Sequence, residues 1–255
     1  MYILLDGALV HNQLRTLPLF ARPGALFEPL MPHPQQHLAG PLLISQNHVA
    51  QDNNARAHVQ ALLDGFGHRL HVAELASPLA LPDLAVHLRR AVWFTDDSGE
   101  SYGLRIADCR VMAYLPTILT PAQWHAITAP LTRWAIQDRQ GNVKALPLDD
   151  KRQEHADTFQ GIQLSAEQVE RLMDEGEPDA LLMQLGRPAG IVTNPRHHED
   201  FSMAQACVRQ WRAGGSADRA ALLELARVTF SAGLASSRDP NWMSRAWQYV
   251  LARRR

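Results

Sequence analysis

The pattern of apolar residues changes between residues 150 and 163, and this change constrains the fold more than any other feature. Before it, short apolar runs such as residues 2–5 and 42–45 alternate with stretches of helical spacing. A short apolar run closed by a turn signal is typical of a buried strand. After the change, apolar residues recur at helical spacing almost throughout. We therefore expect an α+β protein, with a mixed α/β lobe carrying a small sheet over residues 1–150 and an all-helical lobe over residues 160–255.

Strands and helices are predicted from apolar spacing and turn residues. The predicted strands and hairpins cover residues 2–5, 42–45, 69–75, 92–106 and 133–148, although 133–136 also fits a helix. The predicted helices cover residues 8–20, 56–63, 81–90, 179–185, 201–211, 217–230 and 242–251, and two more begin after capping boxes at Thr120 and Ser165. A turn is predicted at residues 6–7 and an ordered loop over the proline-rich residues 21–41.

The segment around Thr120 carries the clearest local signal. Thr120 suits an N-cap, Pro121 the first helical position, and Gln123 the N3 position of a capping box. Leu119 and Trp124 are placed to form the hydrophobic staple that often accompanies such a box. A helix is therefore predicted to begin at Pro121.

Composition and charge exclude several classes of protein. The 255 residues are 46% hydrophobic, enough to bury a sizeable core, and the formal net charge is −1. A nucleic-acid binder normally carries a basic excess, so we expect no nucleic-acid partner. No apolar run approaches the ~18 residues of a membrane span, and the N-terminus lacks the residue order of a secretory signal. We therefore expect a cytoplasmic protein with no membrane partner.

Catalytic and metal-binding patterns are weak. Residues 197–200 (His-His-Glu-Asp) are the most metal-like cluster, but consecutive helical side chains diverge and a closed metal site needs spaced ligands, so a helix start is favoured. Cys109 is flanked by Asp108 and Arg110, whose charges are able to lower a thiol pKa. Without an identifiable histidine partner, a structural cysteine is favoured. No nucleophile elbow or phosphate-binding loop occurs, so we predict no catalytic residue, metal ligand or cofactor from the residues.

Arg105, Asp108 and Arg110 are the charges most suggestive of a function. They fit a charged patch that contacts a partner, and they also fit a buried or half-buried ion pair that fixes the exit of a strand. Arg105 is predicted to lie in an otherwise apolar strand, and pairing is what makes a buried arginine tolerable. The ion-pair interpretation is therefore favoured.

The tryptophans present the same two alternatives. The core of the α/β lobe is predicted to contain Trp93, Trp124 and Trp134. The late helices carry Trp211, Trp242 and Trp247. Tryptophan and arginine anchor many protein interfaces, but an apolar stripe on a helix is more often core.

Five short motifs follow one another in a βα pattern over residues 2–140. In chain order they are an acidic-Gly turn after a strand (2–7), Gly-Pro-Leu-Leu (40–43), a leucine-spaced helix with a late arginine (81–90), Leu-Arg-x-x-Asp-Cys-Arg-Val (104–111) and Leu-Thr-x-x-Gln (119–123). In order and spacing the chain resembles the effector chaperone/adaptor family of bacterial type VI secretion. It departs from the family pattern at Cys109 (family proline), at Leu104 (family aromatic) and at Ser98, which lengthens an Asp-Gly turn.

The resemblance implies a non-enzymatic chaperone or adaptor in the cytoplasm. Such a protein binds an N-terminal segment of a type VI effector, keeps it soluble and helps load it on the VgrG-type spike-tip protein. Covering an exposed apolar segment prevents aggregation, and release requires an interface of moderate size. The candidate partner-binding residues are Arg105, Asp108, Arg110, Trp211 and Trp242. The alternatives are a metal- or His-dependent hydrolase that uses the His, Asp and Glu residues, and a structural oligomer subunit.

Overall fold

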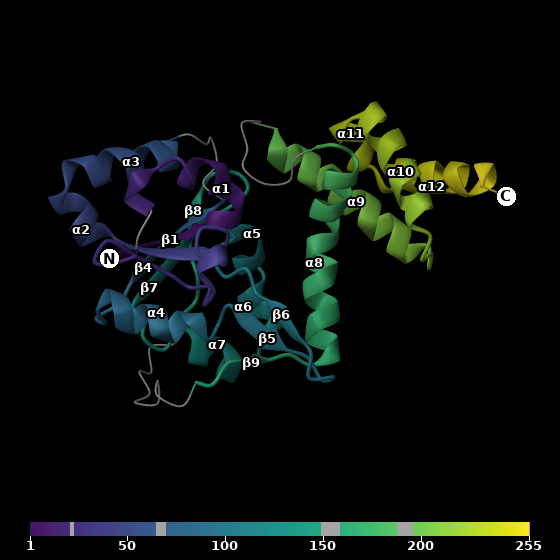
Figure 1. The fold of residues 1–255 in the computed structure, drawn as a ribbon. Helices are drawn as coiled ribbons and strands as arrows, with labels where there is room; N and C mark the ends of the chain where they lie inside the picture. Colours follow the sequence, from purple (N-terminus) through teal and green to yellow (C-terminus); the bar gives the residue numbers. More distant parts are fainter. Residues whose placement is uncertain (21–22, 65–69, 149–158, 188–195, 255) are drawn as a thin grey trace. The chain divides into compact units, whose positions relative to one another are not determined.

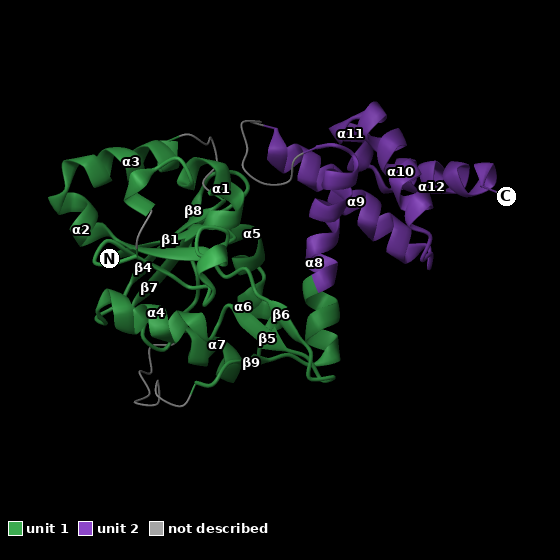
Figure 2. Ribbon diagram, viewed as in Figure 1, with its two compact units in different colours: residues 1–172 green, residues 173–255 purple. Residues whose placement is uncertain are grey.

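The computed structural model of the chain describes residues 1–20, 23–64, 70–148, 159–187 and 196–254 (Figure 1). The chain forms two compact units, unit 1 (Met1–Leu172) and unit 2 (Met173–Arg255) (Figure 2). Unit 1 contains both sheets, and the described part of unit 2 is helical. The predicted α+β class is therefore confirmed. Within the described ranges, no helix combines the length and the apolar character that crossing a membrane requires.

The large sheet of unit 1 has six strands, and every neighbouring pair is antiparallel. In spatial order, these strands are β2 (Phe27–Pro29), β3 (Pro41–Ser45), β1 (Tyr2–Asp6), β4 (Val72–Ala76), β7 (Arg133–Gln137) and β8 (Val143–Ala145). All residues of β1 and β3 are buried, as their apolar runs predict. Arg69, the first residue of the third predicted strand, lies outside the described residues.

Helices cover both faces of this sheet (Figure 1). The helices of unit 1 are α1 (Gly7–Leu14), α2 (Gln46–Gln51), α3 (Asn53–Asp64), α4 (Leu81–Arg89), α5 (Cys109–Met112), α6 (Leu115–Ile118) and α7 (Pro121–Thr128), with 3-10 turns η1 (Pro18–Phe20) and η2 (Pro34–Gln36). Leu4, Leu75 and Trp134 point to the face that packs in one core with Leu84 of α4 and Ile127 of α7. Burial on both faces explains why the central strands read as continuous apolar runs.

Residues 21–41 differ from their prediction as a loop. Residues 27–29 form β2, which pairs with β3, and residues 34–36 form η2. Phe27 is 1% exposed, so burial of one aromatic side chain holds this short strand at the sheet edge. The prolines concealed it in the sequence because proline is tolerated at an edge strand but not in a central one.

A second sheet joins distant parts of the chain. β5 (Trp93–Thr95) and β6 (Ser101–Gly103) form the predicted hairpin, in which Gly99 adopts φ 85°. β9 (Ile162–Gln163) pairs in parallel with β5, with Phe94 opposite Ile162. A two-residue strand has too few positions to show a period, so this pairing was not predicted.

The two predicted capping boxes are confirmed, and they contact each other. Thr120 and Gln123 cap α7 reciprocally, and Ser165 and Gln168 cap α8 (Ala166–Gln184) in the same way. Gln168 Nε2 donates to Gln123 Oε1 at 2.7 Å. The first turn of α8 is therefore tied to unit 1, and the compact units meet inside this helix. The domain limits at residues 150 and 160 stay a prediction.

Unit 2 has its own helical core. Its further helices are α9 (His197–Ala213), α10 (Arg219–Ala232), α11 (Leu234–Ser237) and α12 (Pro240–Arg253). Leu181, Cys207, Leu225 and Trp247 are among the buried side chains of this core. The predicted helices over 201–211, 217–230 and 242–251 are confirmed, and Gly233 ends α10 with φ 90°.

The helix predicted to begin at Asp179 is wrong, because Asp179 lies inside α8. Pro178 also lies inside α8, where a proline removes one backbone hydrogen bond. Leu181 and Leu182 are both fully buried in the core of unit 2. Burial of this apolar face therefore outweighs the local signals that favour a helix start.

Candidate partner-binding site

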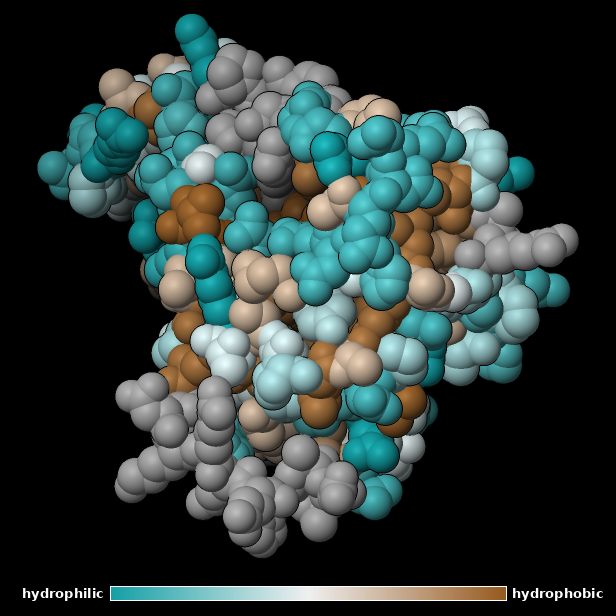
Figure 3. Space-filling view, turned by 90° about the vertical axis from the view of Figure 1, so that its left-hand side faces the viewer, coloured by the Kyte–Doolittle hydropathy of each residue, from teal (hydrophilic) through white to brown (hydrophobic). Residues whose placement is uncertain are grey.

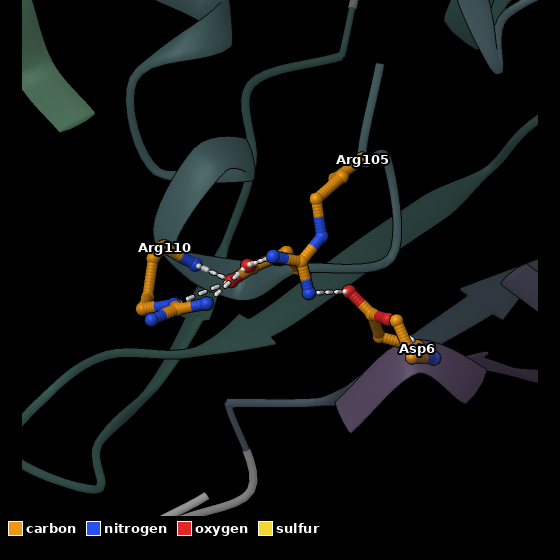
Figure 4. A network of polar contacts seen from close by, with 5 residues as sticks. Asp6, Arg105 and Arg110 are labelled. Carbon is orange, nitrogen blue, oxygen red and sulfur yellow. Dashed lines mark hydrogen bonds and ion pairs between the residues drawn. The ribbon is translucent and has the colours of Figure 1, made fainter. Parts of the chain in front are cut away.

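Three of the five candidate residues lie in one network of charged side chains (Figure 4). The network, called the charge network here, consists of Asp6, Arg105, Asp108 and Arg110. Arg105 Nη2 lies 2.7 Å from Asp6 Oδ2, and Arg105 Nη1 lies 3.3 Å from Asp108 Oδ2. Arg110 donates to Asp108 twice, from Nε to Oδ1 at 2.9 Å and from Nη2 to Oδ2 at 2.6 Å. Two arginines and two carboxylates thus alternate along one chain of contacts.

Both carboxylates of the charge network also cap a helix. Asp6 Oδ1 accepts from the backbone N–H of Ala8 at 3.0 Å, so β1 leads directly into α1 rather than into a separate turn. Asp108 Oδ1 accepts from the backbone N–H of Arg110 at 3.0 Å and caps α5. An aspartate in this position satisfies an otherwise free helix N–H, which explains the acidic residue in each motif.

Burial differs sharply within the charge network. The side chains of Asp108, Asp6 and Arg110 are 1%, 4% and 9% exposed, whereas that of Arg105 is 44% exposed. The favoured sequence interpretation, a buried or half-buried ion pair at the exit of a strand, is therefore confirmed. The placement of Arg105 in the strand itself is wrong, because β6 ends at Gly103. Of the three predicted charges only Arg105 presents an exposed side chain to solvent, and its role in partner binding stays a prediction.

The two carboxylates titrate in opposite directions. Burial raises the pKa of Asp6, and Asp108 raises it further, while Arg105 opposes both effects only in part. Burial would also raise the pKa of Asp108, but the hydrogen bonds and charge of Arg110, together with the charge of Arg105, outweigh it and lower the pKa. Asp108 is thus the carboxylate that is held firmly ionised.

Close backbone packing explains two motif glycines beside the charge network. The N–H of Gly7 donates to the carbonyl oxygen of Gly40 at 3.0 Å. A Cβ at Gly7 would collide with the carbonyl oxygens of Gly40 and Leu38, and one at Gly40 would collide with the side chain of Met31. The acidic-Gly and Gly-Pro-Leu-Leu motifs therefore meet at the end of β1, where Asp6 pairs with Arg105 of the Leu-Arg-x-x-Asp-Cys-Arg-Val motif.

Cys109, which stands where the resembled adaptor family has proline, is integrated into this junction. Its N–H donates to the carbonyl oxygen of Leu70 at 2.9 Å, a bond that proline is unable to make, and its Sγ contacts the carbonyl oxygen of Val72 at 3.2 Å. Burial raises the pKa of the Cys109 thiol to about 12. The hypothesis that flanking charges lower this pKa is wrong, because Arg110 pairs with Asp108 and burial dominates. Burial likewise raises the pKa of the Cys207 thiol to about 11.

The tryptophans of unit 1 follow their prediction in part. Trp124 and Trp134 are buried, with ring centroids 6.0 Å apart. Trp93 is 37% exposed, so its placement in the core is wrong. Alternation along β5 is the reason: Phe94 faces the core and is 6% exposed, which turns Trp93 to the opposite face.

The other two candidate residues, Trp211 and Trp242, lie in unit 2. Both are half-buried and pack against its core, whereas Trp247 is 3% exposed. Trp211 Nε1 donates to the carbonyl oxygen of Asp218 at 3.1 Å, which ties α9 to the start of α10. Each ring therefore has a packing role and an exposed edge, and partner binding by these residues stays a prediction.

Residues 197–200 form the first turn of α9, as predicted. Asp200 pairs with Arg187, whose Nη1 lies 3.0 Å from Asp200 Oδ2. Across the described ranges, no group of three or more His, Cys, Asp and Glu side chains is placed to hold a metal ion. The acidic residues instead lie at a helix N-terminus, where negative charge is favourable.

Residues 1–126 match the model of a family described as Domain of unknown function (DUF4123). The match covers 126 of the chain's 255 residues and includes the whole charge network, but neither Trp211 nor Trp242. The comparison with curated proteins found no match. The comparison with solved structures found no match either.

Proposed function

We propose that this chain is an adaptor that binds the N-terminal segment of a type VI effector and helps load it on a VgrG-type spike-tip protein. One observation carries the proposal. The motifs that resemble the effector adaptors fall within the family match to residues 1–126, and three of them converge on one buried junction. Domains of this family occur in adaptors of type VI effectors.

The edge of the large sheet offers a surface for an extended segment. In the described part of the sheet β8 is an edge strand, and all three of its residues are exposed, Val143 at 68%. An edge strand presents free N–H and C=O groups that pair readily with a further strand. Beside it lies a cavity of about 100 Å³, lined in part by Ile3, Val72 and Ala135. We propose that an effector segment pairs with β8 and places an apolar side chain in this cavity.

One face of the molecule shows how its apolar surface is distributed. Figure 3 views the molecule from the side on which α2 lies in Figure 1, and hydrophobic surface there forms narrow bands between hydrophilic side chains. Apolar surface divided in this way suits an extended or helical segment, which places separate side chains in separate apolar areas. This surface supports binding of a segment, as an adaptor requires.

The hydrolase alternative receives no support from the described residues. It requires His, Asp and Glu side chains that converge on one cavity. The acidic residue Asp200 is paired with Arg187, and both thiols are buried with raised pKa values. We therefore propose a binding protein rather than an enzyme.

Co-expression with candidate effector segments tests the proposal. The tagged chain is produced with and without each N-terminal segment and examined by size-exclusion chromatography. We expect a stoichiometric complex and an effector that is insoluble without the chain. Val143→Asp should abolish the complex because it charges the β8 edge, whereas Val86→Asp, an equal change at an exposed site of α4, should leave it intact.

Two outcomes would contradict the proposal. Absence of any complex with effector or spike proteins would remove the adaptor function. Turnover of a hydrolase substrate by the purified chain would restore the enzyme alternative.

A further inference from the structure

Unit 2 contains a cleft of about 530 Å³ between α9 and the segment that joins α11 to α12. Its volume is within the range of known ligand-binding clefts. Buried Ala206 and Met243 contribute apolar lining, and Gln205 and Gln210 contribute half-buried amides. The cleft thus combines apolar surface with groups that donate and accept hydrogen bonds.

Two exposed arginines, Arg209 and Arg238, line the same cleft. Its lining includes no acidic side chain, and neither guanidinium forms an ion pair within the part of the chain that the structure describes. The acid adjacent to Arg238 is Asp239, whose carboxylate accepts from the N–H of Asn241 at 2.9 Å as the N-cap of α12. The cleft is therefore positively charged.

Several other arginines of unit 2 have a carboxylate partner, whereas the exposed Arg227 and Arg245, which lie outside the cleft, have no ion pair in the described structure. Arg187 contacts Asp200, Arg212 contacts Asp174, Arg219 contacts Glu177, and Arg254 contacts Asp218. The distinction of Arg209 and Arg238 is that two cationic side chains, unpaired among the described residues, line one cavity, where both are free to pair with the same external anion. Carboxylate suits this geometry because a guanidinium binds it with two parallel hydrogen bonds.

We propose that this cleft binds an acidic segment of a partner protein, with Arg209 and Arg238 each pairing with one of its carboxylates. The proposal rests on the proposed adaptor function and adds a second recognition surface to it. The amides and apolar lining suit a peptide, which offers backbone groups and aliphatic carbon besides its charge. The site lies outside residues 1–126, so it would select the partner independently of the family-matched region.

Peptide binding by the full chain tests this inference. A fluorescent hexaglutamate peptide is titrated with the protein and followed by anisotropy, with hexaglutamine as its uncharged counterpart. We expect hexaglutamate alone to bind, and the double variant Arg209→Gln, Arg238→Gln to weaken binding by about tenfold or more. The matched double variant Arg227→Gln, Arg245→Gln removes equal charge from exposed sites outside the cleft and should remain within about twofold of wild type.

Several results would overturn the inference. Equal losses in both double variants would indicate attraction by net charge, and equal binding of hexaglutamine would exclude recognition of carboxylates. Complete displacement by inorganic phosphate at equal charge concentration would identify a small-anion site.

Failure of the cleft inference is distinguishable from failure of the adaptor function. In the first case effector segments still co-purify equally with wild type and with the Arg209→Gln, Arg238→Gln variant. In the second case hexaglutamate binds but no effector segment co-purifies.

Discussion

Arg110 of unit 1 and the two cleft arginines of unit 2, Arg209 and Arg238, lie in opposite environments. In unit 1, Arg110 is 9% exposed and donates two hydrogen bonds to the buried Asp108. In unit 2, Arg209 and Arg238 are exposed at a cleft whose lining is free of acids. Burial with a hydrogen-bonded carboxylate identifies an arginine that stabilises the fold, and exposure at a cavity identifies one that is available to a partner. Mutations in each unit test this distinction.

Asp108→Asn should have the largest effect on stability. It leaves the buried guanidinium of Arg110 without its carboxylate, and breaking a buried pair costs about 3–5 kcal/mol. Urea unfolding measures the loss. Glu170→Gln, which removes an exposed acid of α8, is the control and should change the free energy of unfolding by less than about 0.5 kcal/mol. A loss below about 1 kcal/mol for Asp108→Asn would show that the pair does not hold the fold.

Gly7→Ala should be the next most destabilising change. Its Cβ meets backbone oxygens, which are unable to move aside, so we expect a loss of about 2–3 kcal/mol. Gly40→Ala meets only the flexible side chain of Met31, and the second change Met31→Ala should restore most of the stability it costs. Thermal unfolding of Gly7→Ala and Gly40→Ala, each with and without Met31→Ala, measures these losses of stability. Rescue of Gly7→Ala by Met31→Ala would contradict the assigned contacts.

Arg105→Gln should cost only about 1 kcal/mol, because the side chain is 44% exposed and solvent screens its two ion pairs. The same variant tests the predicted contact with a partner. If Arg105 binds the effector segment, the variant loses the complex on size-exclusion chromatography while it remains folded by circular dichroism. An intact complex would leave Arg105 with a structural role alone.

The pH dependence of stability should separate the two aspartates. The folded-state pKa of Asp108 is lowered, so its contribution is present above the unfolded value of about 3.9 and is lost as pH falls through the folded pKa. The folded-state pKa of Asp6 is raised, so its contribution is present below about 3.9 and is lost as pH rises through the folded pKa. Relative to wild type, Asp108→Asn should reduce the loss of unfolding free energy as pH falls below about 3.9. Asp6→Asn should reduce the loss of unfolding free energy as pH rises above about 3.9. Equal profiles for the two variants in urea titrations would contradict these assignments.

The paired change Arg209→Gln, Arg238→Gln should have the smallest effect on stability. Both side chains are exposed and lack an intramolecular ion pair in the described structure, so the free energy of unfolding should change by less than about 0.5 kcal/mol. Thermal unfolding provides the measurement. A large loss would assign these arginines to the fold, as with Arg110, and would remove the distinction between the units.

Features that depend on neighbouring residues were predicted well from the sequence. The boxes at Thr120 and Ser165 need only residues within one helical turn, and the hairpin at Gly99 needs a residue that tolerates positive φ. The α+β class followed from the change in apolar period. In each case the stabilising contacts lie within a few positions of the signal.

Features that depend on distant residues were missed or only half predicted. Arg105 was expected to need a carboxylate, and Asp108 was named, but Asp6 lies 99 positions away and was assigned to a turn. The cleft at Arg209 and Arg238 was missed because its lining comes from separate helices, and a lone surface arginine carries no signal in one sequence. A sequence signal exists for one of these contacts: the three motifs that meet at Asp6 belong to the same series of motifs along residues 2–140.

The two buried cysteines give each unit an internal reporter of its own opening. Cys109 belongs to unit 1 and Cys207 to unit 2, and both are free thiols in closed cores. The reactive thiolate forms at an appreciable rate only when a core opens, since burial keeps both groups protonated at neutral pH. The alkylation rates of Cys109 and Cys207 in the unmodified chain would therefore record the opening of each core separately. If a bound cargo stabilises one core, alkylation of the cysteine in that core should slow.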